Sequence, residues 1–572
     1  MKKLLFFMVV LTITAGFAFG SGEGEGAAAG DYELNAPASY PTILSDEPYE
    51  FEAFGIYSAT ESSGMHQESK LTAYLEELTN VRIIWKEVVE SSVFNERQNL
   101  LLASGDLPDA ILSAWGMDAQ QAYTYGLNGT LIALNDLIDE KMPDLKKHLS
   151  EYPQYLAQLT SPDGNIYALP DLEAGCFHCF YSGKFFIYKP WAEELGLDWP
   201  PETTEDLFDM LVAFRDGDPN GNGQKDEIPL MGSAAGGWNT NPMIFLMNSF
   251  VYFDNANFLR RDGGKLSFVA NTPEFREGLM YLNKMVDEGL LAPETFVQHN
   301  DQLRALVEHP EDPKVGMVPA GWFGVFTVNN GPSGRFADYW PIAPLVGPNG
   351  EQNSRFNPPA VRFHTKITKA ADRPDIIAQW ANWFYEDVSG GGTGNNLTWN
   401  FHEEGVHWRF LTEEEKKLGL VSRDGTPALT LPIVSDTYGL GADKKDDGWT
   451  RAAPRWTPYN VGGLPLEWKE DRSKQEYWLM VWTRDLMKPY GGEHYIPPNL
   501  VFDESTMDEM TDLKEAISSA TGVVMNWSTE FIVGTRDITD DGEWNDYVRE
   551  LNRAGLDRYV KLWQDTITNA GY

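Results

Sequence analysis

Residues 50–57 read EFEAFGIY and residues 81–89 read VRIIWKEVV, two segments whose alternating or β-branched residues predict strands. The apolar spacing of residues 66–79 and 94–104 predicts a helix after each of these strands. A short apolar run at residues 110–113, AILS, then predicts a third, buried strand. Strands that alternate with helices are typical of a layer built on a parallel sheet, so the sequence predicts the α/β class.

The carboxyl ends of these strands predict where a ligand would bind. Open α/β sheets bind ligands just beyond the carboxyl ends of their strands, which here are residues 57–63 and 113–115. Helical periodicity recurs later in the chain, at residues 204–214, 272–288, 373–387 and 545–554. The chain has no short internal repeat, which argues against a structural or adhesive surface protein.

Length and composition predict a large acidic protein with more than one lobe. The chain has 572 residues, of which 42% are hydrophobic and 13% aromatic, enough for two or more cores. Its formal net charge is −40, and such a surface repels nucleic acid and anionic membranes. We therefore expect no nucleic-acid partner.

The N-terminus predicts export. Lys2 and Lys3 precede an apolar run, and small residues follow it, as in a secretory signal peptide spanning residues 1–20. The stretch 21–40, with its Gly/Glu/Ala-rich start, predicts a flexible leader. No later segment is apolar enough to cross a bilayer, and no cysteine stands at the cleavage point to carry a lipid anchor. We therefore expect a periplasmic protein.

Cys176 and Cys179 are the only cysteines of the chain. In an oxidising compartment, Cys-Phe-His-Cys can close a small local disulfide or contribute two buried thiols. The pair is not a haem attachment motif, because His178 lies between the cysteines rather than after them. A redox-active dithiol is disfavoured, because the thioredoxin-like context is missing.

Residues 218–227, DPNGNGQKDE, predict a calcium site. Side chains with oxygen atoms recur along the loop, and two glycines allow the backbone to curl around one point. Calcium takes about six to eight oxygen ligands, whereas zinc prefers nitrogen and sulfur. The alternative is a solvated Asn/Gly turn. The expected ligands are Asp218, Asn220, Asn222, Gln224 (by its side chain or its carbonyl), Asp226 and Glu227.

The loop starts like an EF-hand and then departs from it. An EF-hand needs a bidentate Glu at position twelve and a helix that leads away from the loop. Here the twelfth position is Pro229, so the chain is expected to leave in an extended conformation. The sequence therefore predicts a structural calcium ion rather than a calcium switch.

Several motifs, in order along the chain, resemble those of one family. They are LASGDLPD (102–109), DGNIYALP (163–170), EIP after the calcium loop (227–229), DEGLL (287–291), EGVHW (404–408), FIVGT (531–535) and GLDRY (555–559). In this order they resemble the family 1 extracellular solute-binding proteins, the sugar-binding components of ABC importers. The calcium loop resembles that of a large subgroup, which includes alginate-oligosaccharide-binding proteins and lipoprotein relatives. The resemblance covers nearly the whole chain after the signal peptide.

The resemblance implies a type II periplasmic-binding-protein fold, with two α/β lobes joined by a hinge and a ligand cleft between them. It implies an N-terminal lobe mainly from residues 41–170, a C-terminal lobe mainly from 171–340, and segments of 341–572 that return to both lobes. The implied function is to capture a carbohydrate, in this subgroup an oligosaccharide, by lobe closure and to deliver it to a membrane permease. A monomer is expected.

Aromatic residues next to polar ones are the expected sugar contacts, because indole rings stack on the C–H faces of sugars. The chain has 19 Trp and 24 Tyr, and most of them must fill the core. Context favours Trp115, Trp238, Trp322, Trp399 and His407, and the resemblance adds Glu404 and Trp408 by position. Arg362 is a candidate for a charged contact, with a surface salt bridge as the alternative.

An exported carbohydrate-active enzyme, a glycosidase or a lyase, is the main alternative function. Two carboxylates suffice for a glycosidase, and the chain has 85 acidic residues from which a pair could come. A zinc protease is excluded, because His402 and His407 are separated by five positions with a glycine between them. No nucleophile elbow or phosphate-binding loop is found, so we expect a binding protein rather than an enzyme.

Overall fold

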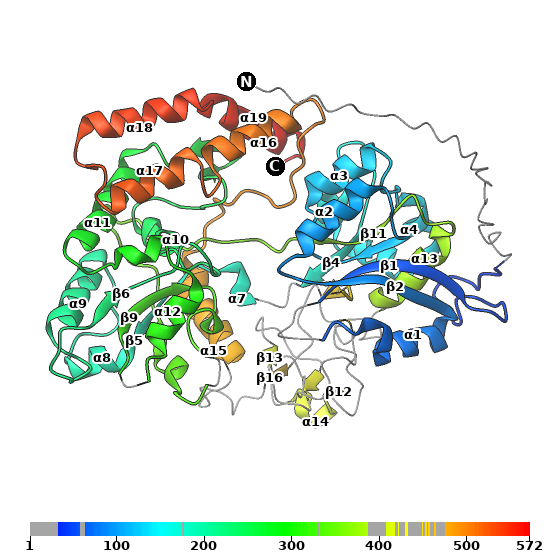
Figure 1. The fold of residues 1–572 in the computed structure, drawn as a ribbon, viewed down its shortest axis with the longest axis horizontal. Helices are drawn as coiled ribbons and strands as arrows, with labels where there is room; N and C mark the ends of the chain where they lie inside the picture. The colour runs from blue at the N-terminus through cyan, green and yellow to red at the C-terminus, as the bar shows by residue number, and fades with distance from the viewer. Residues whose placement is uncertain are drawn as a thin grey trace, which may run out of the picture.

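The protein consists of two α/β lobes, shown side by side in the computed structural model (Figure 1). The structure describes residues 32–57, 63–173, 177–310, 312–328, 331–386 and 475–572, and short stretches between 408 and 464. Each lobe has its own hydrophobic core, one around Phe51 and Trp380 and the other around Phe185 and Phe275. Two separate cores confirm the expectation of more than one lobe.

The N-terminal lobe is built on a six-stranded sheet. Its strands lie in the order β15 (Trp456–Thr457), β4 (Leu169–Glu173), β11 (Arg362–Ile367), β3 (Ala110–Leu112), β1 (Tyr49–Tyr57) and β2 (Val81–Glu90). Its helices are α1 (Lys70–Thr79), α2 (Phe94–Ser104), α3 (Ala119–Leu127), α4 (Asn135–Lys141), α5 (Pro143–Glu151), α6 (Pro153–Leu159) and α13 (Pro374–Ala381). The strands and helices predicted from residues 50–113 are thus confirmed.

The sheet of this lobe is mixed rather than purely parallel. β1 pairs in parallel with β2 and β3, as the alternation of strands and helices predicts. β11, however, runs antiparallel to both β3 and β4. The reason is that β11 enters from the other lobe instead of following a crossover helix within its own lobe.

The C-terminal lobe has a four-stranded sheet in the order β10 (Tyr339–Pro341), β5 (Lys184–Tyr188), β9 (Val315–Ala320) and β6 (Ile228–Leu230). A hairpin of β7 (Leu259–Asp262) and β8 (Lys265–Phe268) lies apart from it. The helices are α7 (Phe177–Phe180), α8 (Lys189–Glu194), α9 (Thr204–Asp216), α10 (Met243–Leu246), α11 (Pro273–Asp287), α12 (Asn300–Val307) and α15 (Gln475–Trp482). α16 (Met507–Ile517), α17 (Val523–Ile532), α18 (Asp541–Arg553) and α19 (Leu556–Asn569) complete this lobe (Figure 1).

Local hydrogen bonds explain where the helices differ from their predicted bounds. The helix predicted at residues 66–79 begins at Lys70, because the Ser69 side chain accepts the Thr72 N–H and caps it there. The helix predicted at 545–554 begins at Asp541, after Asp540 accepts the Gly542 N–H. The helix predicted at 373–387 ends at Ala381 and continues as a 3₁₀ turn to Tyr385.

The direction of the strands shows which edge of each sheet faces the other lobe. The chain passes between the lobes from β4 to β5, from β10 to β11 and from β15 to α15. Since β4 ends and β11 begins at such passages, the carboxyl ends of β1, β3 and β4 face the C-terminal lobe. By the same reasoning, the start of β5 and the carboxyl ends of β6 and β9 face the N-terminal lobe. Ligands of open α/β sheets bind at such edges.

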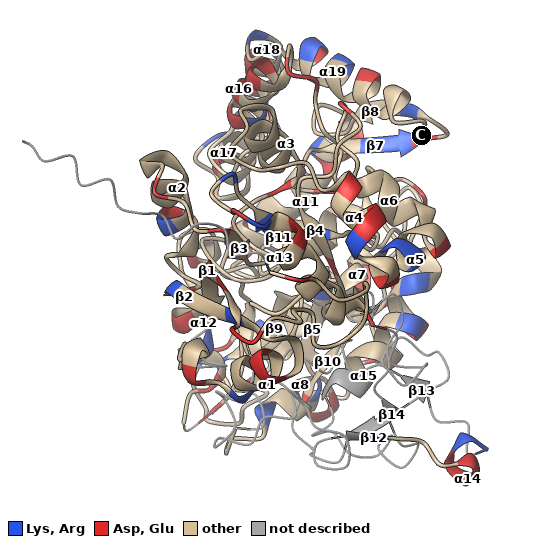
Figure 2. Cartoon of the chain, turned by 90° about the vertical axis from the view of Figure 1, so that its right-hand side faces the viewer, with Lys and Arg blue, Asp and Glu red and all other residues tan. Residues whose placement is uncertain are grey.

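The outer helices carry charged residues of both signs, as expected for a chain rich in acidic and basic residues. Lys and Arg residues are interspersed with Asp and Glu on outer helices such as α5, α18 and α19 (Figure 2). In the part of the chain that the structure describes, no helix is long and apolar enough to cross a membrane.

Candidate functional site

Trp115 and Arg362 lie together at the edge of the N-terminal sheet. The Arg362 guanidinium is 5.8 Å from the centre of the Trp115 ring. It is also 2.6 Å from a carboxylate oxygen of Asp171, whose side chain is only 1% exposed. Arg362 and Asp171 are paired directly across β11 and β4. Arg362 thus forms an ion pair, but with a buried partner rather than the surface salt bridge considered as its alternative.

Trp238 lies at the facing edge of the C-terminal lobe. It follows β6 in the chain, and its side chain is 39% exposed, unusual for an indole. Its carbonyl accepts the Gly321 N–H at 2.8 Å, which fixes its loop to the end of β9. The His178 ring of α7 lies 5.9 Å from its ring. Trp238 thus presents a supported aromatic surface toward the interlobe side.

Trp322 follows β9 on the same edge and is partly buried. A Cβ built on Gly324 would be only 2.2 Å from the Trp322 ring, so the ring lies directly on the backbone of this glycine. Its indole N–H is shielded from solvent and has no hydrogen-bond acceptor in the structure. A buried donor of this kind is costly unless it finds a partner, such as a ligand hydroxyl.

Gly321→Ala is expected to displace Trp238 and to destabilise the protein by about 1–3 kcal/mol, the usual cost of overpacking. The physical reason is that an added Cβ would lie 2.5 Å from a ring carbon of Trp238. Urea unfolding measures the loss of stability. In a Trp238→Ala background the same substitution should cost almost nothing, and an equal cost in both backgrounds would contradict the contact.

The remaining ligand candidates are not tested by this structure. Trp399, Glu404 and His407 lie outside the described residues. Trp408 begins β12 (Trp408–Phe410), which pairs with β14 (Thr430–Pro432), and only its backbone is described.

The predicted calcium loop is curled by backbone conformation. Asp218, Gly221 and Gly223 adopt positive φ angles of 49°, 70° and 73°. The Asp218 carboxylate accepts the N–H groups of Asn222 and Gly223 at 3.1 and 3.0 Å. After the loop the chain continues as β6, so the expected extended exit through Pro229 is confirmed.

Side chains from outside the loop join it. The Lys314 ammonium is 2.6 Å from an Asp226 oxygen and 3.5 Å from an Asp312 oxygen. The hydrogen bond from Lys314 holds the pKa of Asp226 below its usual range. The Asn222 amide donates to Asp312 at 3.1 Å. The sequence interpretation missed Asp312 and Lys314, because they follow the loop by about ninety residues and carry no local motif.

Glu227 is the clearest sign that the loop suits a cation. Both of its carboxylate oxygens are shielded from solvent, and no side chain of the described residues donates a hydrogen bond to them. Burial, together with the nearby charges of Asp218 and Asp226, raises the pKa of Glu227. A divalent cation would supply the missing positive charge. Among the described residues, no group of three or more His, Cys, Asp or Glu could hold a metal ion.

The cysteine motif lies beside the candidate ligand edge. Cys179, in α7, is disulfide-bonded, and the only other cysteine of the chain is Cys176. A disulfide-bonded Cys179 agrees with the local disulfide rather than with two buried thiols, the two alternatives that the sequence left open, and Cys176 itself lies outside the described residues. It precedes the region where Tyr181 packs against Phe356, with ring centres 5.0 Å apart. His178 and Tyr181 are aromatic residues at this edge that the sequence interpretation did not select.

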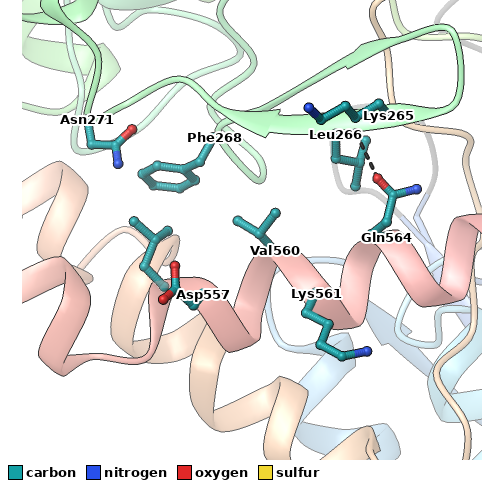
Figure 3. Close-up of a pocket in the computed structure, with 9 residues that line it drawn as sticks. Lys265, Leu266, Phe268, Asn271, Asp557, Val560, Lys561 and Gln564 are labelled. Atoms are coloured by element: carbon teal, nitrogen blue, oxygen red, sulfur yellow. Dashed lines mark hydrogen bonds between the residues drawn. The ribbon is translucent and has the colours of Figure 1, made fainter.

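A surface pocket of about 380 Å³ lies elsewhere, between the β7–β8 hairpin and α19. Phe268 and Val560 face each other across it, and the Gln564 side chain accepts the Leu266 N–H at 2.8 Å (Figure 3). None of the candidate ligand or calcium residues lines this pocket.

Comparisons with known proteins identify relatives that bind solutes. A family model described as bacterial extracellular solute-binding protein matches residues 63–389. The fructooligosaccharide ABC transporter substrate-binding protein FusA of Streptococcus pneumoniae is 28% identical over 522 residues, which cover 87% of this chain and 86% of FusA.

Solved structures share the fold. The structure of FusA with kestose has a TM-score of 0.69 at 24% identity, and covers 91% of this chain and 99% of that chain. An EF-hand mutant of FusA with fructo-nystose has a TM-score of 0.70 at 23% identity, with the same coverage of 91% and 99%. A solute-binding protein of Bifidobacterium longum subsp. infantis has a TM-score of 0.72 at 21% identity, and covers 92% of this chain and 99% of that chain.

These findings decide between the binding protein and the exported glycosidase or lyase. The matched model spans both lobes, and it describes proteins that bind solutes rather than convert them. The type II periplasmic-binding-protein fold expected from the motifs is confirmed by the same matches. The chain belongs to the family of bacterial extracellular solute-binding proteins.

Proposed function

We propose that this protein captures an oligosaccharide between its two lobes and delivers it to the membrane permease of an ABC importer. The observation that carries the proposal is Trp238, whose 39% exposed indole lies at the sheet edge that faces the other lobe. Sugars stack their C–H faces on such rings and direct their hydroxyls to nearby polar groups. The similarity to FusA, which is named for a fructooligosaccharide transporter, supports this class of ligand.

The proposed sugar contacts come from both lobes. Trp115 and Arg362 contribute from the N-terminal lobe, and Trp238 and Trp322 from the C-terminal lobe. The segment after residue 386 is proposed to add further contacts, namely Trp399, Glu404, His407 and Trp408. The Arg362 guanidinium is held between Trp115 and Asp171, so it can donate to sugar hydroxyls while its charge stays balanced.

Ligand binding is proposed to close the lobes about the chain passages between them. A ligand moves such an equilibrium only by its preference for the closed state, which needs contacts from both lobes at once. The lobe bounds remain part of this proposal, with 41–170 mainly N-terminal, 171–340 mainly C-terminal and 341–572 shared. The protein is proposed to act as a monomer.

A structural calcium ion is proposed to bind the loop at 218–227. Asp218, Asn220, Asn222, Asp226 and Glu227 would hold it with side-chain oxygens, and Gln224 with its side chain or carbonyl. The solvent-shielded carboxylate of Glu227, which lies near the charges of Asp218 and Asp226, supports the ion. So does the EF-hand that the name of the FusA mutant structure assigns to that relative.

Export by a signal peptide at residues 1–20 is proposed to place the protein in a periplasm. The family description as extracellular supports a location outside the cytoplasm. The signal segment itself lies outside the described residues.

Trp238→Ala is expected to weaken sugar binding by about tenfold, because an aromatic stacking contact contributes about 0.5–1.5 kcal/mol beyond the apolar area that it buries. Titration calorimetry of the mature protein with kestose, nystose and acidic uronide oligosaccharides measures the affinity and identifies the sugar class. A wild-type protein that binds none of these sugars would contradict the proposed function.

Trp544→Ala is the matched control for this experiment. Trp544 lies on α18 beside Arg276, far along the chain from both sheet edges, and is only partly buried. Its loss should leave sugar affinity unchanged. Appearance of a reducing sugar in the same samples would revive the enzyme alternative.

A further inference from the structure

Each lobe contains one fully buried lysine directly behind its ligand-facing edge. Lys184 begins β5 and Lys366 lies in β11, and both are 0% exposed. Lysine is almost never fully buried, because taking an ammonium group out of water is costly. The two residues therefore call for a physical explanation, and neither belongs to the calcium loop or to the proposed sugar contacts.

Lys366 holds the segment that carries Trp115. Its ammonium donates to the Ser113 carbonyl at 2.7 Å and to the Phe363 carbonyl at 2.9 Å. The Ser113 hydroxyl in turn accepts the Trp115 N–H at 3.0 Å and donates to the Trp115 carbonyl at 3.1 Å. The ammonium thus fixes the turn that follows β3 and that carries Trp115.

Lys184 plays the same part in the other lobe. Its ammonium donates to the carbonyls of His178 and Tyr181 at 2.9 and 2.7 Å. These carbonyls lie within and just after α7, whose His178 ring lies against Trp238. Cations near the last carbonyls of a helix are favourable, because the unpaired carbonyls there carry partial negative charge.

Burial is the one cause that shifts the protonation of Lys366, and it lowers the pKa of this group to about 7. The ammonium is therefore held by backbone carbonyls instead of by a carboxylate. Replacing the lysine by an apolar residue removes these hydrogen bonds, and loss of the donor to a buried carbonyl is costly.

We propose that Lys366 and Lys184 are positioning residues of the ligand site, which fix Trp115 and the His178–Trp238 pair at their respective lobe edges without touching the ligand. The inference rests on the proposed sugar-binding function. It deepens that function, because it assigns the geometry of the two aromatic surfaces to two residues outside the contact surface. Aromatic stacking depends on ring position, so a shifted turn weakens binding even though every contact residue is still present.

The test is a comparison of Lys366→Met and Lys184→Met with wild type, by titration calorimetry with kestose, or with whichever oligosaccharide the wild type binds. Methionine keeps most of the side-chain volume and removes the donors. Each variant is expected to lose about tenfold in affinity, the size of one unpaired buried polar group. Wild-type affinity in both variants would overturn the inference.

A double-mutant cycle separates positioning from general destabilisation. In a Trp115→Ala background, Lys366→Met should cause no further loss of affinity, because the ring that it positions is gone. An equal loss in both backgrounds would overturn the inference for Lys366. Trp238→Ala combined with Lys184→Met gives the same test in the other lobe.

Lys514→Met is the control. Lys514 lies on α16 over the rings of Phe502 and Trp563, and burial lowers its pKa too; in the part of the chain that the structure describes, it donates to none of the carbonyls that Lys184 and Lys366 hold. Its loss should change stability and leave affinity within about twofold of wild type.

If Lys366→Met does not fold, Ser113→Ala carries the test. It leaves both lysines in place and removes only the hydroxyl that joins Ser113 to Trp115. A severalfold loss of affinity is expected, and an unchanged affinity would overturn the inference. A wild-type protein that binds no sugar would contradict the proposed function instead, and the inference with it.

Discussion

Removal of calcium with a chelator is expected to lower the melting temperature of this protein by about 5 °C or more, while sugar affinity changes little. An ion present at about a thousand times its Kd stabilises the folded state by about 4 kcal/mol, which corresponds to a shift of this size. The loop lies between α9 and β6, and β6 is the edge strand of the C-terminal sheet, where it pairs with β9. Calorimetric scans with and without chelator, with titrations in both conditions, measure the two effects.

Glu227→Gln makes this prediction sharper, because it should change sign with calcium. Without the ion the substitution is expected to raise the melting temperature, since it removes a shielded negative charge that lies near the charges of Asp218 and Asp226. With the ion it is expected to lower the melting temperature, since a charged ligand is lost. The raised pKa of Glu227 agrees with this, because an elevated folded pKa means that the ionised form destabilises the fold as pH rises.

Glu294→Gln is the matched control for the calcium prediction. Glu294 is an exposed acid of the same lobe, and it lies outside the loop. Its substitution should have the same small effect with and without calcium. A melting temperature that does not respond to chelator would contradict a structural ion, and loss of sugar binding at an unchanged melting temperature would contradict its structural role.

The sequence could predict those parts of the fold that depend on local periodicity. β1, β2 and the helices after them follow from apolar spacing within ten residues or so, and the extended exit from the calcium loop follows from Pro229. The antiparallel entry of β11 was missed, because its neighbours β3 and β4 precede it by about two hundred residues or more. Pairing across such distances depends on the whole topology.

The candidate site was predicted by residue type but not by partner. Trp115 was selected from its place after a strand and Trp238 from its place in the glycine-rich stretch 236–239, and the structure puts both at the facing edges. The buried partner of Arg362 is Asp171. Nothing in the neighbouring sequence indicates this pairing, because a single Asp in a strand is usually a surface residue. Lys184 and Lys366 each stand in a strand segment that is buried, KFFIY (184–188) and RFHTKI (362–367). A lysine in such a segment is the signal that could have identified them.

Arg355→Ala is expected to destabilise the protein by about 3–5 kcal/mol, the typical cost of removing one partner of a buried ion pair. The Arg355 guanidinium is 3.1 Å from an Asp254 oxygen, and the two side chains are only 13% and 10% exposed. Without Arg355 the Asp254 carboxylate would stay buried with a single backbone hydrogen bond, from Ala256. Urea unfolding of the C-terminal lobe measures the loss.

The position of this pair makes the result informative about the hinge. Arg355 stands at the start of the passage from β10 to β11, and the next residue, Phe356, packs between Tyr181 and Tyr495. The pair therefore anchors a segment that must stay fixed to one lobe while the other moves. Arg355→Met combined with Asp254→Asn should recover most of the lost stability, because no unpaired charge remains buried. If the double variant is as unstable as Arg355→Ala, the packing of this passage rather than its charge balance holds it to the C-terminal lobe.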